Sequence, residues 1–177
     1  DIVDTPHSVP AIPVEPQQTK ARRCIVERDV PATTITIAFH MGDRLSRDFF
    51  LGDMTSDLLA GGDSARLYER LIKKRRLFAS VNAYISGEVD NGLLILTGNL
   101  LDGVTPEVAE KALWGELQKL QNELASEVEL TKIKNKFEAE MTYGEMNIMN
   151  KAMNLGYYSM LGDLPLINRE AEIFRSI

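Results

Sequence analysis

The stretch Gly61–Gly87, GGDSARLYERLIKKRRLFASVNAYISG, carries most of the information about how this chain folds. Its Gly-Gly pair ends one helical pattern, and Asp63 or Ser64 can cap the helix that follows. Apolar residues then recur at helical spacing, which predicts a helix over residues 64–76 with one apolar face. From Ser80 the apolar period changes to two, the spacing of a strand. We therefore expect a helix that leads directly into a strand.

Four strands are predicted from apolar residues that alternate with polar ones. They cover Arg22–Arg28, Thr33–His40, Phe78–Ser86 and Leu93–Gly98. The run Asp90-Asn91-Gly92 predicts a turn between the last two strands. Cys24, the single cysteine, falls in the first strand, so a buried structural thiol is expected there.

Helices are predicted where apolar residues return every three or four positions. A helix over residues 46–60 has Phe50, Met54 and Leu58 on one face. Thr105-Pro106 begins a long helix, with Thr105 as the cap, and its apolar stripe is Ala109, Leu113, Leu117, Leu120 and Leu124. Ser126 and Glu129 form a capping box for the next helix, whose inward residues are Leu130, Ile133, Phe137 and Met141. A helix over residues 145–161 is expected to bury Met149, Ala152, Met153 and Met160, and a short helix over residues 166–174 follows.

The order of these elements predicts the fold class. Hairpin-linked strands with helices in blocks form an α+β domain, with a mainly antiparallel sheet and helices packed on one of its faces. The chain has the composition of a globular protein: of its 177 residues, 44% are hydrophobic and 26% are charged. The net charge of −6 argues against nucleic-acid binding, and no apolar run approaches the roughly 20 residues of a membrane span.

The stretch Gly61–Gly87 resembles a signature of the pitrilysin (insulinase-type) zinc peptidases, the inverzincins. That signature reads Gly-Gly-x-Ser-Ser-Arg-Leu-Phe…Leu-Arg-Glu-Lys-x-Gly-Leu-Ala-Tyr-Ser-Val. The residues that fit it are Gly61, Gly62, Ser64, Arg66, Leu67, Leu71, Leu77, Ser80 and Val81. More narrowly, the chain is similar to the second, non-catalytic domain of a family half, from about Gln17 to its end. The resemblance implies a pitrilysin-like domain of the LuxS/MPP type.

The domain organisation follows from this resemblance. Residues 1–20, with prolines at Pro6, Pro10, Pro13 and Pro16, are interpreted as an extended connector between domains, and a disordered tail is the alternative. Residues 21–177 are the non-catalytic α+β domain. In the family a further helix and a final strand usually follow, so we expect this domain to be truncated at its C-terminus.

Catalytic metal chemistry is not expected within this chain. The family's zinc motif is H-x-x-E-H on a helix, which needs two histidines one turn apart. The only histidines, His7 and His40, are 33 positions apart. A zinc site of His40 with Asp43 and Asp63 is a weaker alternative to a surface histidine. We predict no catalytic residue and no metal ligand here, and the resemblance implies that zinc lies in a preceding domain.

A basic run closes the helix over residues 64–76. Arg70, Lys73, Lys74, Arg75 and Arg76 place five cations in seven residues. Cations at the C-terminal end of a helix complement its dipole, which is one sufficient explanation. The alternative is an electropositive wall that attracts acidic substrate segments, with Lys74, Arg75 and Arg76 as the substrate-binding residues.

Two positions depart from the family pattern. In the family an Arg at this helix end and a Tyr seven residues later both contact the bound peptide. The matching positions here are Ile72 and Ala79, which cannot do so. The resemblance therefore implies a domain that does not clamp the substrate and is the partner of a zinc-bearing domain.

The function expected from the resemblance is that of a chamber-forming, non-catalytic domain in a zinc endopeptidase that cleaves peptides or unfolded polypeptides. The expected partners are the catalytic domain of the same chain, a second family half in a homo- or heterodimer, and the peptide substrate. The alternatives are a scaffold subunit without activity, as in respiratory complexes, and a binder of acidic peptide or nucleic acid through the basic run. The single cysteine permits no internal disulfide, so cytoplasmic and periplasmic locations are both allowed.

Overall fold

The computed structural model describes Pro13 and residues 16–87 and 89–177, in two units that meet between Val30 and Pro31. The described residues before Pro31 are exposed and contain no helix or strand, so the strand predicted at Arg22–Arg28 is wrong. Cys24 is exposed, not buried as predicted. Charged residues flank an apolar run of only three residues here, which is too short to anchor a strand in a core.

Part of the predicted connector cannot be compared with the structure. Residues 1–12, 14 and 15 lie outside the described residues, and so does His7. The connector therefore stays a prediction.

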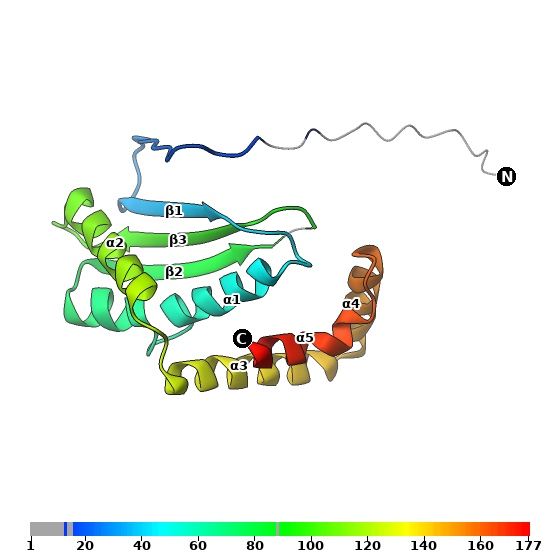
Figure 1. Cartoon of the computed structure of the whole chain (residues 1–177). Helices are drawn as coiled ribbons and strands as arrows, with labels where there is room; N and C mark the ends of the chain where they lie inside the picture. Colours follow the sequence, from blue (N-terminus) through cyan, green and yellow to red (C-terminus); the bar gives the residue numbers. More distant parts are fainter. Residues whose placement is uncertain (1–12, 14–15, 88) are drawn as a thin grey trace. The chain divides into compact units, whose positions relative to one another are not determined.

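The second unit, Pro31–Ile177, contains a three-stranded antiparallel sheet (Figure 1). Its strands are β1 (Thr34–His40), β2 (Phe78–Ser86) and β3 (Leu93–Leu100), in the spatial order β1-β3-β2. Ile37 lies opposite Leu96 in β3, and Leu96 lies opposite Ala83 in β2. Because side chains alternate along a strand, this register fixes one apolar face and one more polar face. The three later predicted strands are confirmed.

Helix α1 (Arg47–Ala60) packs on the apolar face of the sheet. Ser46 caps its first turn by accepting a hydrogen bond from the backbone N–H of Phe49. A Cβ built at Gly52 would lie 3.2 Å from the side chain of Met41 and 3.4 Å from Ile85 of β2, so this turn of α1 lies against the sheet. Helix α2 (Pro106–Asn122) packs in the same cluster. Thr105 precedes it with an extended backbone but makes no side-chain cap, contrary to the prediction.

The segment over residues 64–76 is helical, as predicted, but most of it is not wound as an α-helix. Its main part is a π-helix, η1 (Tyr68–Lys74), in which the N–H of Arg75 bonds the C=O of Arg70. Over two turns the apolar spacing cannot distinguish this wider winding from an α-helix. The chain then reverses through Arg76, whose φ of 49° is in the left-handed region.

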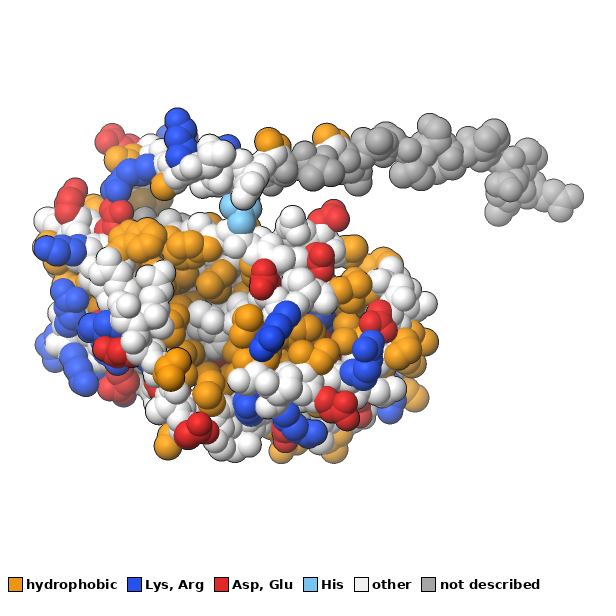
Figure 2. Space-filling model, in the orientation of Figure 1, with side chains coloured by type: hydrophobic (Ala, Val, Ile, Leu, Met, Phe, Trp, Pro, Cys, Tyr) orange, Lys and Arg blue, Asp and Glu red, His pale blue; other side chains and the backbone are white. Residues whose placement is uncertain are grey.

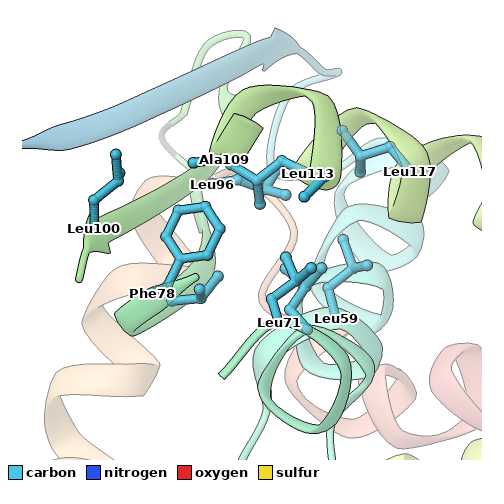
Figure 3. Close-up of a cluster of buried hydrophobic side chains, with 11 residues drawn as sticks. Leu59, Leu71, Phe78, Leu96, Leu100, Ala109, Leu113 and Leu117 are labelled. Atoms are coloured by element: carbon cyan, nitrogen blue, oxygen red, sulfur yellow. The ribbon is translucent and has the colours of Figure 1, made fainter. Parts of the chain in front are cut away.

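The first hydrophobic core lies between the sheet, α1, η1 and α2 (Figure 3). Its buried residues are Leu59, Leu67, Leu71, Phe78, Val81, Leu96, Leu100, Ala109, Ala112, Leu113 and Leu117. The ring of Phe78 lies over Gly98 of β3, where a Cβ would be 2.6 Å from the ring. This contact explains why a glycine stands in the middle of a strand.

The second hydrophobic core lies on the other side of α1. It joins α1 to α3 (Glu127–Glu145), α4 (Ile148–Met160) and α5 (Leu166–Ser176). Its buried residues are Phe50, Met54, Leu58, Ile133, Tyr158, Leu161, Leu166 and Phe174. The predicted inner face of the first helix is confirmed. Because α1 contributes to both cores, it is the central element of this unit.

The inward face predicted for α4 is wrong. Met149, Met153 and Met160 are 64%, 65% and 70% exposed, and Ala152 is also exposed. The helix turns its opposite face, with Tyr158, into the second core. Leu124, predicted to extend the stripe of α2, is 96% exposed because α2 ends at Asn122.

Candidate functional site

The sheet has one face that neither hydrophobic core covers, which we call the outer sheet face. Four residues from each strand form it in register: Thr34, Thr36, Ala38 and His40; Ser80, Asn82, Tyr84 and Ser86; Leu93, Ile95, Thr97 and Asn99. Ile35, Ile37 and Phe39 of β1 point the other way, into the first core. None of the residues that form the outer sheet face is Asp, Glu, Lys or Arg.

A row of hydrogen bonds crosses the outer sheet face at one end. The hydroxyl of Thr34 donates to the Oδ1 of Asn99 at 2.7 Å, and the Nδ2 of Asn99 donates to the hydroxyl of Ser80 at 2.9 Å. These contacts fix the orientation of the Asn99 amide across all three strands. Tyr84, at 47% exposure, and Asn82 add further uncharged polar groups. The face can therefore hydrogen-bond a peptide without selecting for charge.

The five cations at the end of η1 fall into two groups, those held in ion pairs within the domain and those that are not. Arg70 pairs with the buried Glu116 at 2.6 Å, and Lys73 pairs with Glu69 at 2.6 Å. Among the described residues, Lys74, Arg75 and Arg76 form no ion pair, and all three are exposed. The structure thus places all three predicted substrate-binding residues at the surface.

The two positions that match the family's Arg/Tyr pair, Ile72 and Ala79, have no polar side-chain group in this chain. Ile72 is half-buried and packs against the first core. Ala79 is exposed, at a point where the register of β2 shifts between Phe78 and Ser80. A strand bulge changes the direction of its side chains, so sequence spacing alone could not place Ala79.

Arg66, an arginine of the matched signature, has a structural role. It binds Glu129 through two hydrogen bonds of 2.7 and 2.9 Å, and its side chain is buried. Glu129 also completes the predicted capping box with Ser126 at the start of α3. The Arg66 hydrogen bonds lower the pKa of Glu129 to about 2, although burial opposes the shift. The pair joins the segment just before η1 to the start of α3.

A buried polar cluster that sequence analysis missed lies in the second core. Arg44, which follows β1, pairs with Glu170 of α5, and Tyr158 of α4 donates to the same carboxylate. The guanidinium also lies 4.3 Å from the ring centroid of Phe49. Burial and then the Glu170 hydrogen bond raise the pKa of Tyr158, so the hydroxyl stays a donor. No motif links three residues so far apart in sequence.

The described residues contain no group of three or more His, Cys, Asp and Glu that could hold a metal ion. His40 lies at the end of β1, on the outer sheet face, opposite Leu93. Asp43 instead accepts a hydrogen bond from the N–H of Leu45 in the turn before α1. In the part of the chain that the structure describes, no helix is both long and apolar enough to cross a membrane.

The family described as Peptidase M16 inactive domain matches this chain over residues 3–137. The chain belongs to that family. The predicted resemblance to a non-catalytic domain of the zinc peptidases is thereby confirmed, and so is the α+β fold class. No curated protein matches this M16 inactive domain.

Solved structures share the fold of this M16 inactive domain. A protease from Helicobacter pylori has a TM-score of 0.79 at 20% identity, over 85% of this chain and 37% of its own. The inactive peptidase domain of a candidate zinc protease from Bordetella parapertussis has a TM-score of 0.74 at 22% identity, over 85% and 80%. A chain of Complex III2 from Candida albicans has a TM-score of 0.70 at 17% identity, over 85% and 38%. This domain therefore spans well under half of the Helicobacter protease.

Proposed function

We propose that this M16 inactive domain is the non-catalytic, chamber-forming part of a zinc-dependent endopeptidase that cleaves peptides or unfolded polypeptides. The observation that carries the proposal is the outer sheet face of a domain of this family, a surface rich in hydroxyl and amide groups that contains no Asp, Glu, Lys or Arg. Zinc is held by a catalytic domain of the same polypeptide, where it activates a water molecule. The residues of this chain contribute a wall and not a catalytic group.

The composition of the outer sheet face supports a wall that does not select sequence. Hydroxyl and amide groups such as those of Thr36, Asn82 and Asn99 are both donors and acceptors, as a peptide backbone is. A surface without Asp, Glu, Lys or Arg exerts little attraction or repulsion on acidic or basic segments. A chamber with such a wall limits substrates by size and by their unfolded state.

The basic residues Lys74, Arg75 and Arg76 are our candidates for attracting acidic substrate segments. All three are exposed and are not held in ion pairs with described residues. A substrate carboxylate could accept a bidentate pair of charge-assisted hydrogen bonds from one of these arginines. Their contribution is to association, because long-range attraction raises the rate of encounter.

The partners that we propose are the catalytic domain of the same polypeptide and a second family half. A chamber needs walls on more than one side, and one three-stranded sheet provides only one. The Helicobacter protease, more than twice the length matched here, supports a polypeptide with further domains.

A test places new charges on the outer sheet face of the complete polypeptide. Asn82 and Thr97 are register partners, so the double variant Asn82→Asp, Thr97→Asp puts two carboxylates side by side. We expect cleavage of unfolded casein, an acidic substrate, to fall at least about 3-fold at low salt, with zinc content unchanged. The matched control is Gln118→Asp with Gln121→Asp on the exposed face of α2. Equal loss in both double variants would show that the outer sheet face does not contact substrate.

A scaffold subunit without peptidase activity is the second candidate function. The likeness to a chain of Complex III2 favours it, since that chain belongs to a large assembly. The scaffold predicts a complete polypeptide that lacks H-x-x-E-H and binds no zinc. Cleavage of casein that stops when zinc is chelated would exclude it.

A further inference from the structure

Helices α3, α4 and α5, which we call the helical lobe (residues 127–176), pack on one another and against α1. Figure 1 shows α3 and α5 side by side beneath α1. Within the described part of the chain, the first core contains no residue of the lobe, and the residues outside the lobe that are buried in the second core all come from α1. The lobe can therefore separate from α1 in a local opening while the first core stays intact.

The chain enters the helical lobe through a short connection, residues 123–126. Glu123 and Ser126, at its two ends, have extended backbones, and Leu124 between them is 96% exposed. The pair between Arg66 and Glu129 lies beside this connection, so it can persist when the rest of the lobe moves. The connection is therefore a place where the lobe can turn relative to α1.

A cluster of charges lies where α3 contacts α1. Asp53 and Asp57 are one turn apart on α1, and Lys136 and Glu140 are one turn apart on α3. The Nζ of Lys136 lies 2.7 Å from a carboxylate oxygen of Asp57 and 3.7 Å from one of Glu140. The half-buried Asp53 forms no ion pair with a described residue. Three carboxylates thus share one ammonium, whereas both signs of charge are mixed over α3 and α5 on the outer surface seen in Figure 2.

The other groups near Asp53 do not remove this excess of negative charge. Arg44, in the turn before α1, is a second cation, but its guanidinium is paired with Glu170 of α5 and donates to the hydroxyl of Tyr158 of α4. Strand β2, which packs on α1, carries no Asp, Glu, Lys, Arg or His. Burial, followed by the carboxylate of Asp57, raises the pKa of Asp53 to about 6. Asp53 in the closed lobe therefore carries a proton at mildly acidic pH.

We propose that a proton on Asp53 keeps the helical lobe closed on α1 at mildly acidic pH, and that loss of this proton lets the lobe open. In the open lobe water reaches the carboxylate of Asp53, which favours its ionised form. Since the closed lobe binds the proton more tightly, the open fraction rises as pH increases from about 4 to about 6 and is constant on either side. Glu129 stays ionised over this range, because its pKa is about 2. The inference does not depend on the proposed function.

Hydrogen exchange of the complete polypeptide, measured by peptide mass spectrometry, follows the two parts of this domain separately. Dividing the intrinsic exchange rate at each pH by the measured rate gives a protection factor that reports local opening. Between about pH 4 and pH 7, the protection of α3 and α5 should fall at least about 10-fold, while that of β3 changes less than about 3-fold. The rise in the pKa of Asp53 from 3.8 to about 6 limits the fall to roughly 100-fold.

Asp53→Asn removes the titrating group and keeps the shape of the protonated side chain. At neutral pH the protection of α3 and α5 should be at least about 10-fold higher in this variant than in the wild type, and nearly independent of pH. The matched control is Asp48→Asn, at an exposed position of the same helix, which should keep the wild-type pH dependence. Glu140→Gln, also at an exposed position, removes a like charge near Asp53, so the transition should move to lower pH.

Wild-type protection of α3 and α5 that does not change with pH would overturn the proposal, and so would a pH dependence that persists in Asp53→Asn. A parallel fall in the protection of β3 would mean that the whole domain unfolds, which also overturns a separate opening of the lobe. If circular dichroism shows that Asp53→Asn does not fold, Glu140→Gln decides. An unchanged transition pH in that second variant would contradict the proposal.

Discussion

Replacing Asp53 of α1 with asparagine should stabilise the domain at neutral pH. Burial, and then the nearby carboxylate of Asp57, raise the pKa of Asp53 to about 6, from an ordinary value of 3.8. Lys136 and Arg44 oppose the shift, while Glu140 adds to it. Ionisation of Asp53 therefore destabilises the folded state. An uncharged amide of the same shape avoids this loss of stability.

The size of the effect follows from the shift. A pKa raised from 3.8 to about 6 corresponds to about 3 kcal/mol at 1.36 kcal/mol per unit, as an upper bound. The folded state binds the extra proton, so the stability of the wild type falls as pH rises from about 4 to about 6. The variant should be about 1–3 kcal/mol more stable than the wild type above pH 6, with the difference gone below pH 4.

Urea unfolding followed by circular dichroism, from pH 4 to pH 8, measures this difference directly. The comparison variant is Asp57→Asn, one turn along α1. It breaks the 2.7 Å ion pair with Lys136 but also removes the carboxylate that repels ionised Asp53, so its stability should stay within about 1 kcal/mol of the wild type. A difference between Asp53→Asn and wild type that does not change with pH would refute the reasoning, as would a variant less stable at pH 7.5.

Two further substitutions, one in each core, can be tested by thermal or urea unfolding, with Gly144→Ala as the control for the first. Gly98→Ala should cost about 1–3 kcal/mol, because the new Cβ meets the fully buried ring of Phe78, whereas Gly144→Ala, with open space around it, should be neutral or slightly stabilising. Glu170→Gln should cost about 3–5 kcal/mol, because it leaves the buried guanidinium of Arg44 without its counter-charge. A loss below about 1 kcal/mol would mean that the buried pair is not formed as described.

The elements that sequence predicted well are those whose signals are local. Ser126 and Glu129 form the predicted capping box, and the alternation in Thr34–His40 and Phe78–Ser86 gave strands with the expected inner faces. These signals involve only residues within one or two turns of each other, so they can be recognised without knowledge of the tertiary structure.

The failures share a different cause, which is that periodicity identifies an apolar face but not what covers it. In α4 the methionine face is the more regular, but the structure buries Tyr158, whose hydroxyl donates to Glu170. The partnership between Arg66 and Glu129, 63 residues apart, was equally out of reach of local patterns. The role of Lys74, Arg75 and Arg76 in substrate binding stays a prediction, and the outer sheet face could be found only from the strand register.

The central claim is that this domain supports a zinc peptidase whose metal lies in another domain. Elemental analysis of zinc, performed on the purified 177-residue chain and on the complete polypeptide, tests it most directly. We predict about one zinc ion per complete polypeptide, as for a single catalytic site, and none bound to the 177-residue chain. Zinc at a one-to-one ratio in the 177-residue chain, or none in either protein, would contradict the claim.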